Sequence, residues 1–544
     1  MRNRSVVAAA VFTVLCLSAP RIHAQDANIP HLEKRGETTQ LVVDGRPFLM
    51  LGAELHNSSS SSLDYMQPIW PKLAALPLNT VLTPLSWELI EPAEGKYDFT
   101  LIDGLLAQAR ENHLRIVFLW LASWKNGMSS YPPVWVKSDT RRFPRAILQG
   151  RESNILSTFG QATQEADARA FAAVMKHIRE VDGRDHTVLM MQVENEVGTL
   201  GDSRDHSPAA ERAFHGEVPV ELTKYLAAHR DSFFPDLSEL WLKNGAKTSG
   251  TWEQVFGATT RTDEIFMAWN YSKYVQSVAA AGKAAYPLPM YVNTWLAGAD
   301  TPPGEFPSGG PQPRVVDVWK AAGSGSGPAI DIYSPDIYAT NFSQWCDWYN
   351  RAGNPLFIPE THGGETGAAN VFYAFGERAA LGVSPFGIDS QLDFSVEKPN
   401  DLGASYAVLQ ELTPAILEAQ AKGPTHGFVL DKSHPMVEFE MNGYSVQVTL
   451  DEIFGSQTGQ GFGMILADGP DRFIGAGKGF RVSFALREPS GQHVGIASID
   501  EGRFVDGKWV AGRRLNGDEN DQGNYWRFDQ KSIHIEKAMV YRFQ

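Results

Sequence analysis

Apolar positions recur along this chain with two different periods. Between about residues 40 and 420, short apolar runs alternate with helical patterns. Segment 100–112 repeats leucine, isoleucine and alanine at the spacing of one helix face, and the run 115–124 that follows is almost continuously apolar. Continuous apolar strands separated by helices indicate a parallel sheet that helices cover on both faces.

The same unit repeats often enough to predict a closed sheet. Further strands are expected at 78–87, 187–196, 288–295, 330–338, 354–364 and 382–389, with a helix at 165–181. This repetition predicts an α/β fold, a (β/α)8 TIM barrel with insertions. A doubly wound sheet is the alternative, but it usually carries a glycine-rich phosphate turn after its first strand, and "MLGAELHNSSSSS" is not such a turn.

The pattern changes near the C-terminal end of the chain. In "VEFEMNGYSVQVTL", apolar and polar residues alternate on both sides of Asn442-Gly443, a strong signal for a two-residue hairpin. The stretch "FVDGKWV" repeats the arrangement. We therefore expect the chain to divide into a barrel at 25–422 and a small β-sandwich-like domain at 425–544.

The N-terminal segment has the composition of an export signal. Arg2 and Arg4 precede the apolar run "SVVAAAVFTVLCLSA", and the small Ala24 is suited to cleavage before Gln25. The apolar run is short for a membrane span. We therefore expect residues 1–24 to be a signal peptide, and the mature protein to be periplasmic or secreted without a membrane anchor.

Charge and cysteine content narrow the set of partners. The formal charge is −15, and removing residues 1–24, which hold three arginines and no acid, would change it to −18 (−15 − 3). An acidic surface argues against nucleic acid or anionic membrane as partners. Cys346 is the only cysteine outside the expected signal, so the mature chain should have no internal disulfide.

The residue types also restrict the chemistry. The 14 histidines form no His-x-x-x-His pattern or Cys/His cluster, and no Gly-x-Ser-x-Gly elbow occurs, so we expect no metal, no cofactor and no serine-hydrolase site. The chain holds 14 Trp, 16 Tyr and 29 Phe. An acidic, aromatic-rich exported protein is typical of sugar handling, because aromatic rings pack on the apolar faces of sugars.

Two of the expected strands end in glutamate. "MMQVENEVG" leads an apolar strand into Glu194 and Glu196, and "PLFIPETHGG" ends in Glu360. Strand alternation directs Gln192 and Glu194 into the barrel and keeps Glu196 on the same face, nearer the rim. The active sites of such barrels lie at the C-terminal ends of the strands, so Glu196 and Glu360 are expected on one rim.

Paired carboxylates on one rim indicate glycoside cleavage. One carboxyl must be protonated to give a proton to the leaving oxygen, and the other must be ionised to stabilise or attack the anomeric carbon. Facing carboxylates push their pKa values apart, which supplies both forms at one pH. A structural salt bridge is the alternative for either glutamate alone, but it fits two rim glutamates less well.

Another expected strand ends in residues suited to sugar contact. "LPMYVNTW" ends in Asn293 and Trp295, an amide and a flat ring at the predicted rim. A turn residue and a packed rim aromatic are equally plausible interpretations of this pair.

Three stretches, "QVENEVG", "LSWELIEPAEGKYDF" and "LGAELH", carry a resemblance to a known family. They are similar to the acid/base segment, the Trp…Glu-Pro…Gly…Asp-Phe stretch and the first strand of glycoside hydrolase family 35, the β-galactosidases. The resemblance spans about residues 40–390 and extends to the wider clan of retaining barrel glycosidases. The C-terminal β domain resembles an appendage of a bacterial branch associated with plant-polysaccharide breakdown, including that of galactosylated xyloglucan.

The resemblance implies a retaining exo-β-galactosidase that removes terminal β-galactosyl residues by double displacement. It makes Glu196 the general acid/base and Glu360 the nucleophile. It also puts Asn195 at the sugar 2-hydroxyl and Tyr338, the end of "SPDIY", near the nucleophile. Glu194 would then be a supporting buried carboxylate, expected to pair with a cation.

The chain departs from the family near the sugar pocket of its relatives. "NSSSSS" at 57–62 stands where the family has a His-Tyr-aromatic/Pro-Arg pattern, and Trp87-Glu88 replaces its Trp-Asn. The identity of the sugar is therefore less constrained than the type of reaction. Another retaining β-glycosidase of the clan (a glucosidase, mannosidase or xylosidase) and a non-catalytic sugar-binding relative remain open.

Overall fold

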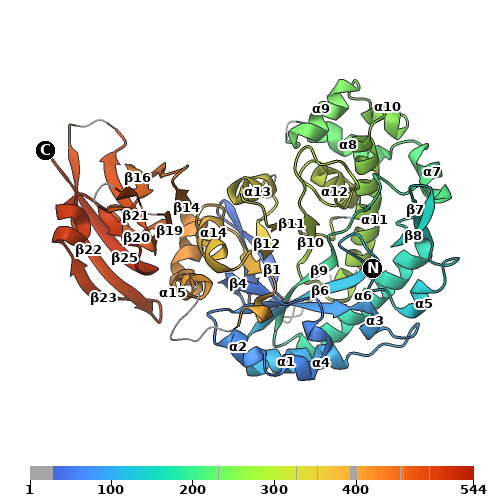
Figure 1. Cartoon of the computed structure of the whole chain (residues 1–544), viewed down its shortest axis with the longest axis horizontal. Coiled ribbons are helices and arrows are strands. Elements are labelled where there is room, and N and C mark those ends of the chain that lie inside the picture. The colour runs from blue at the N-terminus through green and yellow to red at the C-terminus, as the bar shows by residue number, and fades with distance from the viewer. Residues whose placement is uncertain are drawn as a thin grey trace, which may run out of the picture.

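A closed barrel of parallel strands forms the larger part of the molecule (Figure 1). The computed structural model describes residues 28–544 except 231, 326, 352, 393–400, 454–455, 458 and 489–490. Hydrogen-bonded neighbours follow the closed order β10-β11-β12-β13-β4-β5-β6-β9, which confirms the expected (β/α)8 TIM barrel. The barrel strands are β4 (Met50–Glu54), β5 (Thr80–Ser86), β6 (Arg115–Lys125), β9 (Val188–Asn195), β10 (Met290–Trp295), β11 (Ile332–Ile337), β12 (Phe357–Thr361) and β13 (Gly382–Pro385).

Apolar side chains cover both faces of the barrel wall. Alternate strand residues point inward and form one buried cluster, whose members include Met50, Leu82, Val117, Leu119, Met190, Tyr291, Ile332 and Phe357. The residues between them point outward and join a larger core shared with the helices. Burial on both faces explains why these strands are continuous apolar runs in the sequence.

A small antiparallel sheet closes the end of the barrel at which the strands begin. Its strands are β1 (His31–Arg35), β2 (Thr38–Val43) and β3 (Arg46–Phe48). Leu41 and Val43 belong to the same buried cluster as the inward-facing barrel residues. Asp44 forms an ion pair with Arg115 at 3.0 Å, at the start of β6, and a hydrogen bond with His186 at 2.7 Å, just before β9. The barrel interior is therefore sealed at this end.

Helices pack around the outside of the barrel (Figure 1). Those of the barrel units are α1 (Leu63–Met66), α2 (Trp70–Ala74), α3 (Trp87–Ile90), α4 (Thr100–Glu111), α5 (Val134–Lys137), α6 (Gln161–Asp182), α11 (Thr260–Ala285), α12 (Val316–Gly323), α13 (Phe342–Tyr349), α14 (Gly364–Gly376) and α15 (Asp401–Lys422). Helices α6 and α11 approach closely at Gly282, where a Cβ would lie 2.3 Å from the ring of Phe171. Only glycine permits this approach.

Two insertions lie between barrel strands. The hairpin β7 (Arg145–Leu148) and β8 (Arg151–Leu156) follows α5. The helices α7 (Pro208–Phe214), α8 (Val220–Ala228), α9 (Pro235–Lys243) and α10 (Trp252–Phe256) separate β9 from α11.

The C-terminal part of the chain, which we call the β domain, is formed by two antiparallel sheets. Their orders are β14-β19-β20-β25-β22-β23 and β15-β16-β21-β24. The strands are β14 (Thr425–Asp431), β15 (Met436–Met441), β16 (Tyr444–Leu450), β19 (Gln460–Ala467), β20 (Arg472–Lys478), β21 (Phe480–Leu486), β22 (His493–Val505), β23 (Lys508–Leu515), β24 (Trp526–Phe528) and β25 (His534–Phe543). A short pair, β17 (Glu452–Ile453) and β18 (Ser456–Gln457), lies between β16 and β19.

Both expected hairpins are present in the β domain. Asn442 and Gly443 have φ angles of 54° and 82° and join β15 to β16. Asp506 and Gly507 have φ angles of 50° and 71° and join β22 to β23. Positive φ at both central positions is the geometry that an Asn-Gly or Asp-Gly turn adopts most easily.

The β domain packs on the last two helices of the barrel units, α14 and α15 (Figure 1). The rings of Phe372 on α14 and Phe462 on β19 lie 5.6 Å apart. Phe462 and Met464 belong to the same apolar core as the barrel helices. The backbone NH of Phe504 also donates to Glu411 on α15 at 2.9 Å. The two parts are thus joined by a continuous apolar interface.

In the part of the chain that the structure describes, no helix combines the length and the apolar character needed to cross a membrane. The signal peptide expected at 1–24 lies outside the described residues.

Candidate active site

Three carboxyl groups meet at the C-terminal ends of the barrel strands. Glu196 follows β9, Asp336 lies near the end of β11, and Glu360 lies on β12. Asp336 and Glu360 are register partners in the sheet. One carboxylate oxygen from each of the three residues lies within 4.8 Å of the others, and all three residues are buried. The structure therefore brings together the two predicted glutamates and adds an aspartate that sequence analysis did not select.

Glu196 sits in a turn that is strained for a residue with a side chain. Its φ angle is 44°, a left-handed value uncommon outside glycine. The backbone NH of Glu196 donates to Asn293 Oδ1 at 2.9 Å, and Asn126 Nδ2 donates to Glu196 Oε2 at 2.5 Å. Asn293 thus holds the backbone of Glu196 in place, and Asn126 holds its carboxyl group. Strain maintained by surrounding contacts is typical of functional sites.

The surroundings of Glu196 favour its protonated form near neutral pH. Burial is the main cause that raises its pKa to about 7, and the negative charge of Glu360 adds to it. The ammonium group of Lys125 and a hydrogen bond with Asp336 act in the opposite direction. A carboxyl group with this pKa can give up and regain a proton near pH 7, as a general acid/base requires.

Three donors converge on the Glu360 carboxylate. Tyr338 Oη donates to Oε2 at 3.0 Å. Asn195 Nδ2 and Asn293 Nδ2 approach Oε1 at 3.5 and 3.4 Å. Burial and the charge of Glu360 raise the pKa of Tyr338 far above its ordinary range, so the phenol remains a donor. Both oxygens of Glu360 are therefore held by neighbouring side chains.

The side-chain amide of Asn195 is oriented by a lysine. Lys125 Nζ donates to Asn195 Oδ1 at 3.0 Å, which turns the amide nitrogen toward Glu360. Lys125 ends β6 and also lines the cavity above the carboxylates. Sequence analysis missed this lysine, because no pattern in "LASWKNG" distinguishes it from a solvated loop cation.

Asn293 occupies the centre of the site rather than its edge. It is buried, its Oδ1 accepts from Glu196, and its Nδ2 donates to Asp336 at 2.8 Å as well as approaching Glu360. The predicted sugar contacts Trp295 and Tyr338 lie differently. Each is 40% exposed, and both line the open cavity.

A cavity of about 600 Å³ opens above the three carboxyl groups. This volume lies within the range of small-molecule sites. Its walls carry four aromatic rings, and its polar lining comes from several strand ends. The residues that line it are Asn57, Lys125, Asn126, Glu196, Trp295, Leu296, Gly298, Asp336, Tyr338, Ala339, Asn341, Trp345, Glu360 and Phe386. Aromatic walls above a carboxylate floor suit a sugar with apolar faces and many hydroxyl groups.

Glu54, on β4, is a further acid that sequence analysis did not select. It is fully buried, and within the described chain neither of its carboxylate oxygens has a hydrogen-bond partner. Burial, and next the charge of Glu360, raise its pKa well above the ordinary value, and Lys125 opposes this. Strand alternation from the inward-facing Met50 would have directed Glu54 into the barrel.

Glu194 does not lie where the alternation of β9 predicts. Its carboxylate accepts from the backbone NH groups of Ser123 at 3.2 Å and Trp124 at 2.8 Å. Its acidic neighbour is Asp167 on α6, which in turn accepts from Trp120 Nε1 at 2.9 Å. The prediction that Glu194 points into the barrel is wrong, because its φ angle of 60° breaks the strand alternation.

The expected cation partner of Glu194 is also a wrong prediction. Two backbone NH groups and a second carboxyl group surround it, and among the described residues no cation bonds to it. Burial, followed by the charge of Asp167, raises the pKa of Glu194 well above its ordinary value.

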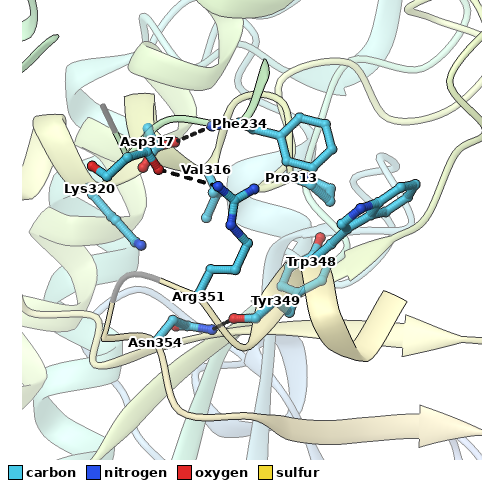
Figure 2. A pocket seen from close by; sticks show the side chains of 10 residues that line it. Phe234, Pro313, Val316, Asp317, Lys320, Trp348, Tyr349, Arg351 and Asn354 are labelled. Atoms are coloured by element: carbon cyan, nitrogen blue, oxygen red, sulfur yellow. Dashed lines mark hydrogen bonds between the residues drawn. The ribbon is translucent and has the colours of Figure 1, made fainter. Parts of the chain in front are cut away.

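A second pocket, shown in Figure 2, is too small to hold a sugar. Its volume is about 20 Å³, close to the space of a single water molecule. Arg351 reaches across it toward the loop that precedes α9, and its guanidinium lies 5.7 Å from the ring centre of Phe234. The backbone NH of Phe234 donates to Asp317 at 3.4 Å. These contacts join the loop to α12 and indicate a structural role.

Comparison with known families gives matches in two segments. Residues 70–262 match the model of glycoside hydrolase family 42, described as Beta-galactosidase. Residues 402–527 match a domain of unknown function, DUF5597. The first segment includes Glu196 and ends before β12, which carries Glu360. The match is to family 42 and not to family 35, which the sequence motifs resemble; the two families belong to the same clan.

Named relatives match over part of the chain. Over 206 residues the chain is 28% identical to a beta-galactosidase of Xanthomonas manihotis, which covers 36% of this chain and 31% of that protein. Over 180 residues it is 25% identical to beta-galactosidase-1-like protein 3 of Rattus norvegicus, which covers 33% and 27%. The matched part of the chain thus spans between a quarter and a third of the length of these relatives. The family match and the relatives support a glycosidase enzyme.

Solved structures with a similar arrangement include a β-galactosidase from Bacillus circulans sp. alkalophilus. It has a TM-score of 0.46 and 13% identity, covering 68% of this chain and 57% of that one. The catalytic domain of a β-amylase from Paenibacillus polymyxa has a TM-score of 0.43 and 14% identity, covering 62% and 91%.

Proposed function

We propose that this protein is a retaining, exo-acting β-galactosidase in which Glu196 is the general acid/base and Glu360 the nucleophile. The observation that carries the proposal is the pair of buried carboxylates, with oxygens within 4.8 Å of each other, at the floor of one cavity. Retaining glycosidases hold their carboxyl groups about 5–5.5 Å apart, whereas inverting ones need roughly 6.5–9.5 Å to admit a water molecule. The close pair therefore favours retention.

In the first step, a Glu360 carboxylate oxygen attacks the anomeric carbon while Glu196 gives its proton to the glycosidic oxygen. The bond from the anomeric carbon to the leaving oxygen breaks as the bond to Glu360 forms. In the second step, Glu196 takes a proton from a water molecule, which displaces Glu360 from the same carbon. Two inversions give a product with the starting anomeric configuration, and Glu196 regains its proton.

The neighbouring side chains have separate tasks in this reaction. Asn195, oriented by Lys125, offers its amide nitrogen beside Glu360, where the sugar 2-hydroxyl would lie. Tyr338 holds the attacking carboxylate through its hydroxyl group. Trp295, half-exposed at the cavity wall, offers a flat surface to a sugar ring. Asn293 positions Glu196 and Glu360 relative to each other, since it bonds to both.

The proposed substrates are oligosaccharides and polysaccharides with terminal β-galactosyl residues, galactosylated xyloglucan oligosaccharides among them. The names of the matched family and relatives support galactose. The stretch that departs from family 35 contributes Asn57 to the cavity wall, while Ser59 Oγ donates to Asp389 at 2.5 Å. A changed wall at this place could select another sugar, so glucosidase, mannosidase and xylosidase activities are the alternatives.

The proposed setting is the periplasm or the extracellular space. Support comes from the signal-like composition of residues 1–24. Neither nucleic acid nor a membrane surface is a proposed partner.

A substrate panel with covalent trapping tests the proposal. Purified protein should hydrolyse an aryl β-galactoside faster than the matching glucoside, mannoside and xyloside. An activated 2-deoxy-2-fluoro-β-galactoside should add one covalent label, which peptide mapping should locate on Glu360. The nearest competitor in sequence is Glu365, which is exposed in the first turn of α14. Labelling of Glu365 or Glu194, or an inverted first product, would overturn the assignment.

A further inference from the structure

A groove that is larger than the catalytic cavity runs between the barrel and the β domain. Its volume is about 680 Å³. The barrel contributes the start of α13 and one side of α14, including Ser343 and Tyr373. The β domain contributes strands β14 and β15, including His426 and Phe439. The volume is large enough for a ligand of several rings.

This groove adjoins the catalytic cavity. Tyr338 and Ala339 line the cavity, and the next residues of the same segment, Thr340 and Phe342, line the groove. Asn341 lines both. A chain that left the catalytic cavity past Tyr338 would therefore meet the groove at Asn341.

The lining of the groove has the chemistry of a carbohydrate site. The rings of His426 and Phe439 stack face to face, with centres 3.9 Å apart and an angle of 19° between their planes, and form a two-layer aromatic platform whose outer faces remain for a ligand. His426 Nδ1 is hydrogen-bonded to Glu377 Oε2 at 3.1 Å, which fixes the platform to the barrel. Asn370 and Glu438 supply polar groups beside it. A sugar can stack its apolar face on such a platform while its hydroxyl groups bond to the polar rim.

The charge of the lining narrows the class of ligand. Among the described residues that line the groove, acids and histidines occur but no lysine or arginine. Such a lining repels phosphate, sulfate and uronate groups. A neutral glycan fits it, and a nucleic acid or an anionic polysaccharide does not.

From the shared wall at Asn341, the aromatic platform and the absence of cations in the described lining, we infer that this groove binds the backbone of a neutral polysaccharide or oligosaccharide whose terminal sugar lies in the catalytic cavity. The inference rests on the proposed glycosidase function and assigns the β domain a part in substrate binding. The apolar contact of Phe372 with Phe462 joins the two parts of the chain that form the walls of the groove.

Kinetics on a short and a long substrate test the inference in the full-length protein. His426→Ala and Phe439→Ala should lower kcat/KM on a galactosylated xyloglucan oligosaccharide by about three- to tenfold, mainly through KM, because each removes half of a stacked pair. Both variants should keep wild-type kcat/KM on an aryl β-galactoside, which does not extend beyond the cavity. An equal effect on both substrates, or none on either, would overturn the inference.

A variant that narrows the groove tests the inference even if the alanine variants fail to fold. Ser343 is exposed on α13, so Ser343→Trp narrows the groove without removing a packed side chain. It should impair the oligosaccharide reaction alone. Glu438→Ala and Glu440→Ala form a matched pair on β15, because both are exposed and only Glu438 lines the groove. Only Glu438→Ala should raise KM for the oligosaccharide.

Failure of the proposed function can be distinguished from failure of this inference. If the wild-type protein cleaves no aryl glycoside, the galactosidase proposal fails. The Kd of the same xyloglucan oligosaccharide, measured by calorimetry, then tests whether the groove binds it. A Kd that rises at least about threefold in Ser343→Trp would support the groove, whereas an unchanged Kd or no binding by the wild-type protein would exclude it.

Discussion

Two acidic clusters lie on opposite sides of the end of β9. On the helix side, Glu194 and Asp167 lie between the barrel wall and α6, and backbone NH groups bond to the Glu194 carboxylate. On the cavity side, Glu196, Asp336 and Glu360 share a space that a sugar can enter. Burial is the main cause of a raised pKa for both Glu194 and Glu196.

The comparison shows that a raised pKa does not by itself identify a catalytic acid. Each carboxyl oxygen of Glu194 accepts a hydrogen bond from a backbone NH group, and Glu194 does not line the cavity. Glu196 lines this cavity of about 600 Å³. Access to the cavity distinguishes the two residues, because Glu194 also has a carboxyl neighbour, Asp167, but does not line the cavity. The helix-side cluster should therefore affect stability, and the cavity-side cluster should affect turnover.

The largest expected effect is that of Glu360→Gln. Loss of the nucleophile should reduce kcat on any β-galactoside by on the order of 10⁴-fold or more, because the amide cannot form the covalent intermediate. Steady-state kinetics measure this loss, and in Glu360→Ala, whose short side chain leaves room for the anion, azide should restore turnover with formation of an α-galactosyl azide. Glu365→Gln is the matched control and should retain wild-type activity. A Glu360→Gln enzyme with about a tenth of wild-type turnover would contradict the assignment.

Glu196→Gln should have the next largest effect, and the effect should depend on the leaving group. On oligosaccharides, kcat/KM should fall roughly 10²- to 10⁴-fold, since the leaving oxygen needs a proton. On aryl galactosides with acidic phenols, kcat/KM should fall much less, because these phenols leave without protonation. Comparing kcat/KM across a series of phenols measures the difference. Equal losses across the series would contradict the acid role.

Glu194→Gln should affect stability more than turnover. The amide keeps one acceptor oxygen, so one of the NH groups of Ser123 and Trp124 loses its partner at a cost of about 1–3 kcal/mol. Scanning calorimetry should show a lower Tm, while kcat/KM should keep its pH profile. A loss of kcat/KM as large as that of Glu196→Gln, without a change in Tm, would contradict the stability role of the helix-side cluster.

The pH dependence of stability is a second test of the role of Glu194. The raised pKa of Glu194 means that the folded protein retains a proton that the unfolded chain releases above the ordinary glutamate pKa. The contribution of Glu194 to stability is therefore present at low pH and declines as pH rises toward the folded-state pKa. Glu194→Gln should reduce this decline, which Tm values across the acidic range would reveal.

The smallest expected effect is a shift in the titration of Glu196. In the wild-type enzyme, kcat/KM should decrease as pH rises through about 7, since the acid must be protonated. In Glu360→Gln, the pKa of Glu196 should fall below that value, because a neighbouring negative charge is gone. It should remain above 4.5, since burial is the larger cause. Carboxyl carbon NMR titration measures it, and an unchanged pKa would show that the two groups do not interact.

Regular strands made most of the fold predictable from sequence. Where a strand keeps its alternation, one inward-facing residue identifies the others. Ile332 points into the barrel, and Asp336, four residues later on the same strand, does so too. The same alternation predicts that Asp336 and Glu54 point into the barrel. They were not selected because a single acid in a strand is not distinctive without knowing which strands meet at the rim.

The two glutamates that matter most stand where regular structure ends. The register of β12 against β13 shifts between Ile358 and Thr361, and this irregularity lets Glu360 face the same way as Asp336. Positive φ angles at Glu194 and Glu196 reverse the expected direction of Glu194. Alternation cannot anticipate such departures, because they depend on tertiary contacts such as those of Asn126 and Asn293 with Glu196.

The sheet of β1, β2 and β3 has a consequence for the traffic of molecules through the site. Because Leu41 and Val43 seal the far end of the barrel, the opening beside Trp295 and Tyr338 must serve as both entrance and exit. In the proposed reaction, the trimmed chain vacates this opening first, and the freed monosaccharide follows from the dead end behind it. Released galactose then competes with the next chain for the same passage, so its accumulation in the medium should slow the enzyme.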